Sequence, residues 1–214
     1  ERGKREGENQ TVSDALSAPS SVSYETVLTW AQFETWLAKI EAAELTALDT
    51  ETTSLDAFGA RIVGLSLCVT VGEACYIPLA HCGPGVVEQL PREQALTRLK
   101  PWLESAKHKK ILQNAKYDQH VLANHGIALK GVAHDTMLES YVLESDKGHD
   151  LEQLCNRHLN LKTISYTEVC GKGANQISFD QVDLERAATY AAEDADVTLR
   201  VHQALTPHFA GEAG

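Results

Sequence analysis

Apolar residues recur along the chain with two different periods, and these periods predict its helices and strands. Between residues 30 and 43 they recur every three or four positions, and Thr29 and Gln32 have the spacing of a capping box, so a helix is expected there. Its apolar face would consist of Trp30, Phe33, Trp36, Leu37 and Ile40.

The next three apolar runs predict strands. The first starts at Leu45 and continues into a polar sequence that ends at Leu55. The second and third cover residues 61–71 and 74–80, and Gly72-Glu73 between them suits a two-residue hairpin turn with glycine first. One strand followed by an antiparallel pair is therefore expected.

The rest of the chain alternates short strands with helices. Helical patterns cover residues 91–105, with a kink expected at Pro101, and then 115–125, 136–143, 150–158 and 180–205. Short strands are expected at residues 110–113 and 129–134. This order predicts an α/β fold, in which a mixed β-sheet begins as an antiparallel hairpin meander and is flanked by α-helices.

Composition changes at both ends predict one domain with two short extensions. Residues 1–23 are rich in Glu, Lys, Gly and Ser and have almost no apolar periodicity, so a disordered linker is expected. Residues 24–207 would form the domain, since 43% of the 214 residues are hydrophobic. Residues 208–214 would be a tail. The chain starts at Glu1 and its only methionine is Met137, so a piece of a longer protein is expected.

Charge and residue usage exclude several functional classes. The formal net charge of −11 argues against a broad duplex-binding surface, because such surfaces are basic, but it allows a small pocket with bound metal ions. The five cysteines include no CxxC pair, and the nine histidines show no local zinc-binding spacing. No apolar run is long enough to span a membrane. We expect a cytoplasmic monomer without structural zinc, whose histidines lie on the surface or in the core.

Two acids at the end of the first predicted strand are the first candidate for chemistry. Asp49 and Glu51 are two positions apart, so they project to the same face. At ~5 Å and an effective dielectric of ~20, their repulsion is about 3 kcal/mol. The two interpretations are a divalent metal site and a solvated strand end.

Two later segments supply more acids. Asn114 and Asp118 lie where a strand leads into a helix, and they would point the same way if the helix began early. Alternatively, Asn114 is the helix N-cap and Asp118 a solvated acid of the first turn. Tyr190 and Asp194 share a face of the last helix beside several alanines, the alternative being an ordinary helix with surface acids, as expected for Glu193 and Asp196.

Together the three segments predict a metal site more strongly than any one of them does. Four carboxylates and an aromatic hydroxyl suit two oxygen-preferring divalent ions, Mg²⁺ or Mn²⁺. Two such ions ~3.5–4 Å apart can clamp a phosphodiester while water displaces one of its oxygens.

The segments LDTETTSLD, QNAKYD, DTMLESYVL and YAAEDADVTL closely resemble the 3′→5′ proofreading exonuclease domain of bacterial DNA polymerase I. This is the DEDDy group of the ribonuclease H-like exonucleases, and the resemblance runs from about Ser23 to Pro207. It implies a ribonuclease H-like fold and an exodeoxyribonuclease that removes mismatched 3′-terminal nucleotides by two-metal-ion hydrolysis. It also implies a single-stranded or frayed 3′ end of DNA as substrate and a bacterial polymerase domain C-terminal to this chain.

The resemblance assigns roles residue by residue. Asp49, Glu51 and Asp194 would bind one metal ion, Asp49 would bridge to a second ion that Asp118 holds through water, and Tyr190 would orient the attacking water. With an ordinary pKa near ~10, Tyr190 would not act as a base at neutral pH.

The resemblance also implies a set of substrate contacts. Leu55 would wedge between the last two bases and Tyr166 would stack on the terminal one, the alternative for both being core packing. The residues near the phosphates would be Gln113, Asn114 and Tyr117. A basic residue usual in the family before His149 is replaced here by Gly148.

Two other functions stay open from the sequence. A ribonuclease D-like exoribonuclease would use the same metal chemistry on RNA. A catalytically silent scaffold is the third, but all four metal-binding carboxylates and the tyrosine are present.

Overall fold

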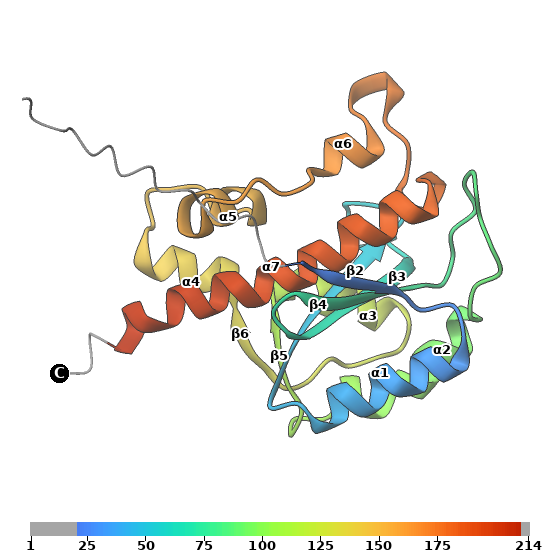
Figure 1. Ribbon diagram of the computed structural model, residues 1–214, viewed down its shortest axis with the longest axis horizontal. Coiled ribbons are helices and arrows are strands. Elements are labelled where there is room, and N and C mark those ends of the chain that lie inside the picture. Colours follow the sequence, from blue (N-terminus) through green and yellow to red (C-terminus); the bar gives the residue numbers. More distant parts are fainter. Residues whose placement is uncertain (1–20, 211–214) are drawn as a thin grey trace, which may run out of the picture.

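The computed structural model describes residues 21–210. They form one mixed six-stranded sheet in the order β1-β4-β3-β2-β5-β6, with helices on both faces (Figure 1). The strands are β1 (Ser23–Thr26), β2 (Leu45–Thr52), β3 (Ile62–Thr70), β4 (Glu73–Pro78), β5 (Lys109–Leu112) and β6 (Val132–Asp135). The predicted linker at residues 1–23 lies outside the described residues except for its last three positions, and Ser23 already belongs to β1.

The strand directions confirm the predicted mixed sheet. β3 pairs antiparallel with β2 and β4, and the pairs β1–β4, β2–β5 and β5–β6 are parallel. β1 was not predicted, because its four residues SYET include no apolar run. The predicted turn is wrong by one residue. Thr70 pairs with Glu73, so Gly72 is the second turn residue, where its φ of +86° favours glycine.

The helices follow the predicted pattern, apart from one additional short helix, two 3₁₀ turns and both ends of the last helix. They are α1 (Trp30–Ala42), α2 (Arg92–Leu103), α3 (Ala115–Asn124), α4 (Thr136–Leu143), α5 (Leu151–Leu159), α6 (Tyr166–Cys170) and α7 (Leu184–Ala210). α6 and two 3₁₀ turns, at Gly173–Asn175 and Phe179–Gln181, were not predicted. α7 starts after the second of these turns, later than predicted. No helix within residues 21–210 combines the length and the apolar character needed to cross a bilayer.

α7 also continues beyond its predicted end at Leu205. Pro207 lies inside it, and the helix runs on to Ala210, since a proline removes one hydrogen bond near the C-terminus but has a helical φ. Residues 208–210 of the predicted tail are therefore helical, and residues 211–214 lie outside the described part.

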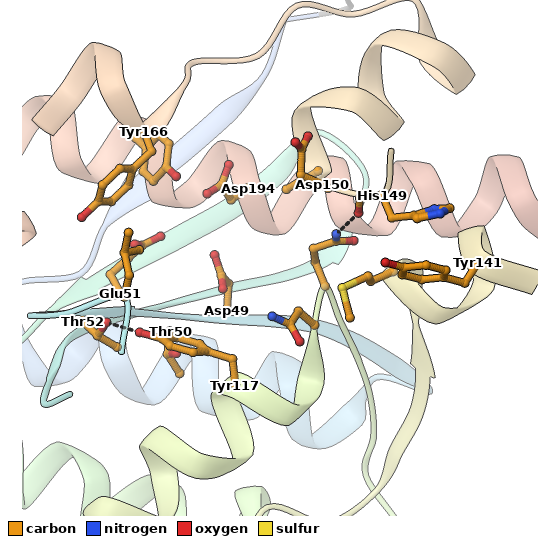
Figure 2. A pocket seen from close by; sticks show the side chains of 16 residues that line it. Asp49, Thr50, Glu51, Thr52, Tyr117, Tyr141, His149, Asp150, Tyr166 and Asp194 are labelled. Carbon is orange, nitrogen blue, oxygen red and sulfur yellow. Dashed lines mark hydrogen bonds between the residues drawn. The ribbon is translucent and has the colours of Figure 1, made fainter. Parts of the chain in front are cut away.

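The alternation of side chains along β2 positions the polar residues that follow. Ala47 packs with residues of α7, whereas Leu48 packs with residues of α1, α2 and α3 on the opposite face. Because side chains alternate along a strand, Asp49 and Glu51 face α7 and Thr50 faces α3 (Figure 2).

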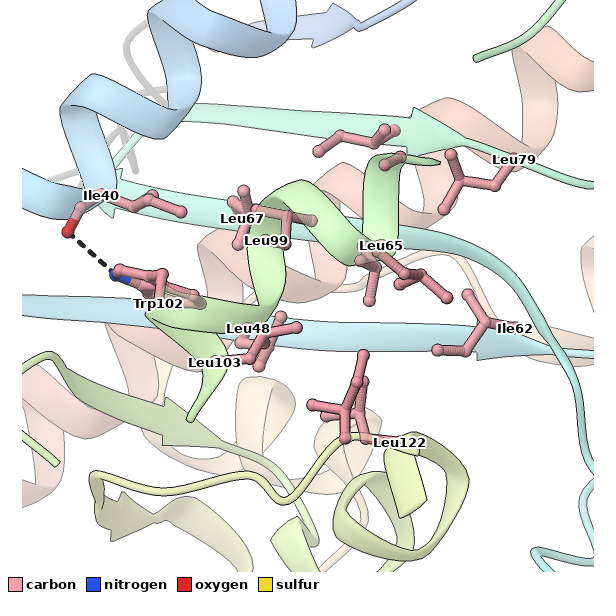
Figure 3. Close-up of a cluster of buried hydrophobic side chains, with 14 of the residues drawn as sticks. Ile40, Leu48, Ile62, Leu65, Leu67, Leu79, Leu99, Trp102, Leu103 and Leu122 are labelled. Carbon is pink, nitrogen blue, oxygen red and sulfur yellow. Dashed lines mark hydrogen bonds between the residues drawn. The ribbon is translucent and has the colours of Figure 1, made fainter. Parts of the chain in front are cut away.

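The largest apolar cluster lies between the sheet and the helices α1, α2 and α3 (Figure 3). The predicted capping box of α1 is present, with Thr29 accepting from the backbone N–H of Gln32. Four of the five predicted face residues are buried, but Trp30 is 37% exposed and only packs edge-on against Phe33. α2 is joined to α1 by the Trp102 indole, which donates to the carbonyl oxygen of Ile40 at 3.2 Å.

Asp196 attaches the edge of the sheet to α7. Its carboxylate accepts from the Tyr24 hydroxyl at 2.6 Å, from the Gly72 N–H at 2.8 Å and from the Arg200 guanidinium at 3.0 Å. Asp196 is 1% exposed. The Glu193 carboxylate accepts from the N–H of Ile164 at 2.7 Å and is half-buried. The prediction that both are surface acids is therefore wrong, because each satisfies a long-range partner that the sequence pattern does not reveal.

Lys110 joins β5 to the end of α2. It is fully buried, and its ammonium group donates to the carbonyl oxygens of Trp102 at 2.6 Å and Ser105 at 2.9 Å. Burial lowers the pKa of Lys110 to about 8. The Trp102 carbonyl oxygen also accepts from the Ser105 N–H at 3.2 Å, so Lys110 adds a charged donor at the C-terminal end of α2, where helix carbonyl groups lack partners within the helix.

We expect Lys110→Met to lower the free energy of unfolding by about 2–3 kcal/mol, since both carbonyl groups lose a charged donor. Urea unfolding measures the change. Lys109→Met is the matched control, because Lys109 is exposed in the same strand and its loss should change stability by less than about 0.5 kcal/mol. Equal stability of the two variants would contradict this role of Lys110.

Candidate active site

A pocket opens at the end of β2 that is lined by the polar residues predicted from the sequence (Figure 2). Its wall on the strand side includes Asp49 and Glu51, and Tyr190 and Asp194 of α7 lie opposite. Nine of the ten predicted site residues line it, and the tenth, Asp118, does not.

Three carboxylates converge in this pocket. One oxygen each of Asp49, Glu51 and Asp194 can be chosen so that all three lie within 4.8 Å of one another. Asp49 and Glu51 share a face of β2, and the alanines of α7, such as Ala191 and Ala195, are fully buried against that face. Small side chains allow the helix backbone to come close to the sheet, which brings Asp194 to the two strand acids.

Burial and mutual repulsion change the protonation of these acids. Burial raises the pKa of Asp49 to about 7. Burial, followed by the charges of Asp49, Asp194 and Asp118, raises the pKa of Glu51 well above its ordinary range. Burial and the charge of Asp49 do the same for Asp194. The cluster therefore favours either bound protons or a bound cation.

The donor set fits a hard divalent cation. An octahedral Mg²⁺ ion with bonds of ~2.1 Å places its ligand oxygens ~3–4.2 Å apart, so a 4.8 Å cluster needs only small shifts to hold one. All three donors are carboxylate oxygens, the atoms that Mg²⁺ and Mn²⁺ prefer. The acidic cluster can therefore hold a divalent ion.

Asp118 lies beside the cluster and not within it. It is 2% exposed, and its Oδ1 accepts from the hydroxyl of Thr50 and from the Thr50 N–H at 3.2 Å. β2 pairs with β5 only from Leu45 to Ala47, so the N–H of Thr50 needs another acceptor and Asp118 of α3 provides it. The interpretation of Asp118 as a solvated first-turn acid is therefore wrong. Burial and then the charge of Asp49 raise its pKa.

Asn114 occupies the N-cap position of α3, as one of the two interpretations predicted, but its side chain does not act as the cap. Its backbone is left-handed, with φ of +64°, and its side chain makes no capping hydrogen bond. Asn114 is exposed and lines the pocket whereas Asp118 is buried, so the two do not point the same way. Asp135 accepts from the N–H groups of Asn114 at 3.0 Å and Ala115 at 2.8 Å, and so takes over the cap of α3.

Tyr190 lies one turn before Asp194 on α7 and lines the pocket. Its ring packs against Phe179 and Tyr166, with ring centroids 5.8 and 6.4 Å away. Burial and then the charges of Asp194, Glu51 and Asp49 raise the pKa of Tyr190. Its hydroxyl is therefore protonated at neutral pH and can donate a hydrogen bond.

The turn after β2 presents an exposed apolar side chain. Leu55 is 73% exposed and lines the pocket, which excludes the core-packing alternative for it. The Tyr117 hydroxyl, which lies 2.5 Å from the Thr52 hydroxyl, donates to the carbonyl oxygen of Ser54 at 2.6 Å and so holds this turn. Tyr166, from α6, lies half-buried across the pocket.

One wall of the pocket was not predicted. It consists of Met137 and Tyr141 of α4, with His149 and Asp150 before α5. The Tyr141 and His149 rings stack with centroids 3.7 Å apart. The side chain of Gln113 holds this wall, because its amide nitrogen donates to the His149 carbonyl oxygen at 2.7 Å. Two signals from the family resemblance pointed to this wall: the segment DTMLESYVL contains Met137 and Tyr141, and the family usually has a basic residue just before His149.

Comparison with known protein families identifies the family of this chain. Residues 24–210 match the family model of a 3′-5′ exonuclease domain. The chain belongs to this 3′-5′ exonuclease family. The exonuclease is 54% identical over 205 residues to DNA polymerase I of Pseudomonas aeruginosa, covering 94% of this chain and 22% of that protein. It is 41% identical to DNA polymerase I of Rhizobium leguminosarum, covering 88% and 20%.

The exonuclease therefore spans about a fifth of the length of these relatives. Solved structures share its fold at low sequence identity. RNase D of Trypanosoma brucei has a TM-score of 0.65 and 14% identity, covering 85% of this chain and 64% of that one. Brucella melitensis NrnC with bound Mg²⁺ has a TM-score of 0.59 and 17% identity, covering 90% and 84%. These likenesses confirm the predicted ribonuclease H-like fold.

The raised pKa values predict how the stability of the metal-free exonuclease depends on pH. Asp49 has a pKa of about 7 in the folded state and about 3.8 as its ordinary value. The protonated carboxyl therefore stabilises the fold fully below about pH 4, and this contribution is lost progressively as the pH rises to about 7, above which Asp49 is ionised in both states. In EDTA we expect the free energy of unfolding to fall between about pH 4 and 7, by up to ~1.4 kcal/mol per pH unit from Asp49.

Urea unfolding of wild type and Asp49→Asn at each pH separates the contribution of Asp49 from that of the other titratable groups. The variant should show a smaller fall, and saturating Mg²⁺ should reduce the fall in wild type. If wild type, relative to the variant, were as stable at pH 7 as at pH 5, the pKa of Asp49 would not be raised in the folded state and this prediction would be wrong.

Proposed function

We propose that this exonuclease removes nucleotides one at a time from the 3′ end of a DNA strand by metal-dependent hydrolysis, and that it proofreads for a DNA polymerase. The observation that carries the proposal is the convergence of Asp49, Glu51 and Asp194 within 4.8 Å in a chain of the 3′-5′ exonuclease family.

The carboxylates have distinct tasks in this proposal. Asp49, Glu51 and Asp194 would hold one divalent ion, and Asp49 would share a second with Asp118, which acts through water because its oxygen is engaged by Thr50. Two bound ions such as Mg²⁺ or Mn²⁺ supply a hydroxide at neutral pH and stabilise the charge on the phosphoryl and leaving 3′ oxygens.

Tyr190 would orient the attacking water. Its hydroxyl stays protonated at neutral pH because burial and the nearby carboxylates raise its pKa. It therefore acts by donating a hydrogen bond and does not take the proton from water.

Side chains around the carboxylates would hold the strand end. Leu55 is exposed enough to enter between the last two bases, and Tyr166 would stack on the terminal base, which contributes ~1–3 kcal/mol without selecting a base. Gln113, Asn114 and Tyr117 would lie near the phosphates. A mispaired end frays at a lower free-energy cost than a paired one, so it reaches such a pocket more often.

The polymerase context is supported by the relatives. Those at 54% and 41% identity are DNA polymerase I proteins of which this chain covers about a fifth. We infer that the exonuclease works as a monomeric domain beside a polymerase domain in the bacterial cytoplasm.

We expect Asp49→Asn and Asp194→Asn each to lower the rate of nucleotide release by roughly 10³-fold or more, since each removes a metal ligand. The assay follows a 5′-labelled single-stranded DNA oligonucleotide with and without Mg²⁺. Glu185→Gln is the matched control, because Glu185 is an exposed acid of α7 outside the pocket. Full activity of either aspartate variant would refute the site, and wild type without activity in Mg²⁺ or Mn²⁺ would favour a silent scaffold.

DNA and RNA oligonucleotides of matched sequence separate the proposal from its alternative. We expect faster degradation of DNA by at least tenfold under identical Mg²⁺ conditions. A preference of the same size for RNA would favour a ribonuclease D-like exoribonuclease with the same carboxylates.

A further inference from the structure

A second group of metal-ligating side chains meets where β6, α4 and α7 come together (Figure 1). His134 lies in β6, Glu139 lies on α4 and His202 lies on α7. One ligand atom from each can be chosen so that all three lie within 4.8 Å of one another. Since the three come from separate elements, no local spacing in the sequence reveals them.

The separations suit a small ion. Nδ1 of His202 lies 2.9 and 3.2 Å from the two carboxylate oxygens of Glu139. A tetrahedral zinc ion with bonds of ~2.0–2.1 Å places its ligand atoms ~3.3 Å apart. The His134 ring lies against His202, with centroids 4.2 Å apart and planes at 36°. A hydrogen bond accounts for the pair Glu139 and His202, and ring contact accounts for the pair His134 and His202, but neither contact requires a ligand atom from all three side chains to converge.

Burial gives the group a rigid part and an open part. The side chains of His202 and Glu139 are 11% and 13% exposed, so packing holds their orientation. His134 is exposed, which gives an ion a path from solvent and leaves room for a water as the fourth ligand.

This group is separate from the acidic cluster in place and in chemistry. His202 is eight residues beyond Asp194 on α7, which is ~12 Å along the helix axis. Two imidazoles and one carboxylate suit a borderline transition metal such as zinc, whereas the acidic cluster offers oxygen atoms alone.

We propose that His134, Glu139 and His202 form a binding site for a zinc-class transition-metal ion that joins the C-terminal half of α7 to α4 and β6. The site does not depend on the proposed nuclease activity. It would stabilise α4, the helix that carries Met137 and Tyr141 into the pocket.

The test uses the 214-residue chain with Asp49→Asn and Asp194→Asn, so that the acidic cluster no longer competes for the ion. Titration with Zn²⁺ against a chromogenic chelator should show one bound equivalent. Adding His134→Gln should weaken this binding at least tenfold, whereas adding His208→Gln should leave it unchanged, because His208 is an exposed histidine of the same helix. Co²⁺ should give visible absorption bands that the His134→Gln chain lacks.

Melting temperatures show whether the His134→Gln chain has lost the metal site or has only become less stable. Without metal, the His134→Gln chain should melt with its parent, since His134 is exposed, and Zn²⁺ should raise the melting temperature of the parent only. Failure of the parent to bind Zn²⁺, or equal affinity with and without His134→Gln, would overturn the site.

Discussion

Mutual repulsion among three carboxylates that are buried or half-buried on one face of the sheet is the constraint on which the rest of this structure depends. Asp49 and Glu51 have to share a face because they are two residues apart on β2, and α7 packs its alanines and Asp194 onto that same face. Burial raises the pKa values of all three acids. A fold that collects such groups is stable in its ionised form only with positive charge between them.

α7 is the element that combines stability with chemistry. Asp196 fixes the sheet edge through Tyr24 and Gly72, and two residues earlier Asp194 completes the acidic cluster. Tyr190 lies one turn before Asp194, and His202 lies two turns beyond it. Since one rigid helix carries all four, the packing of its alanines on β2 and β3 fixes the geometry of the pocket.

Local patterns in the sequence were enough to predict most of the fold and the acidic cluster. The two-residue alternation of β2 placed Asp49 and Glu51 together, and the apolar spacing placed most helices within a few residues. The resemblance then added Leu55, Tyr166 and the α4 segment, which spacing alone does not connect to the acids.

Contacts between distant segments could not be predicted in this way. Asp118 is held by an N–H of Thr50 that β5 leaves without a partner. Asn114 has a left-handed backbone, and Asp135 of β6 accepts from its N–H and so caps α3. Asp196 looked like a surface acid because its partner Tyr24 lies in a strand with no apolar run. In each case the deciding hydrogen bond spans at least twenty residues, beyond the range of any local period.

The most direct test of the central claim is a crystal of the 214-residue chain soaked in Mn²⁺, measured at a wavelength where manganese scatters anomalously. The account predicts an anomalous peak bounded by Asp49, Glu51 and Asp194, with manganese–oxygen distances near ~2.1–2.2 Å. A structure at saturating Mn²⁺ with no peak there, and with the three carboxylates still in contact, would show that protons alone neutralise the cluster and would contradict it.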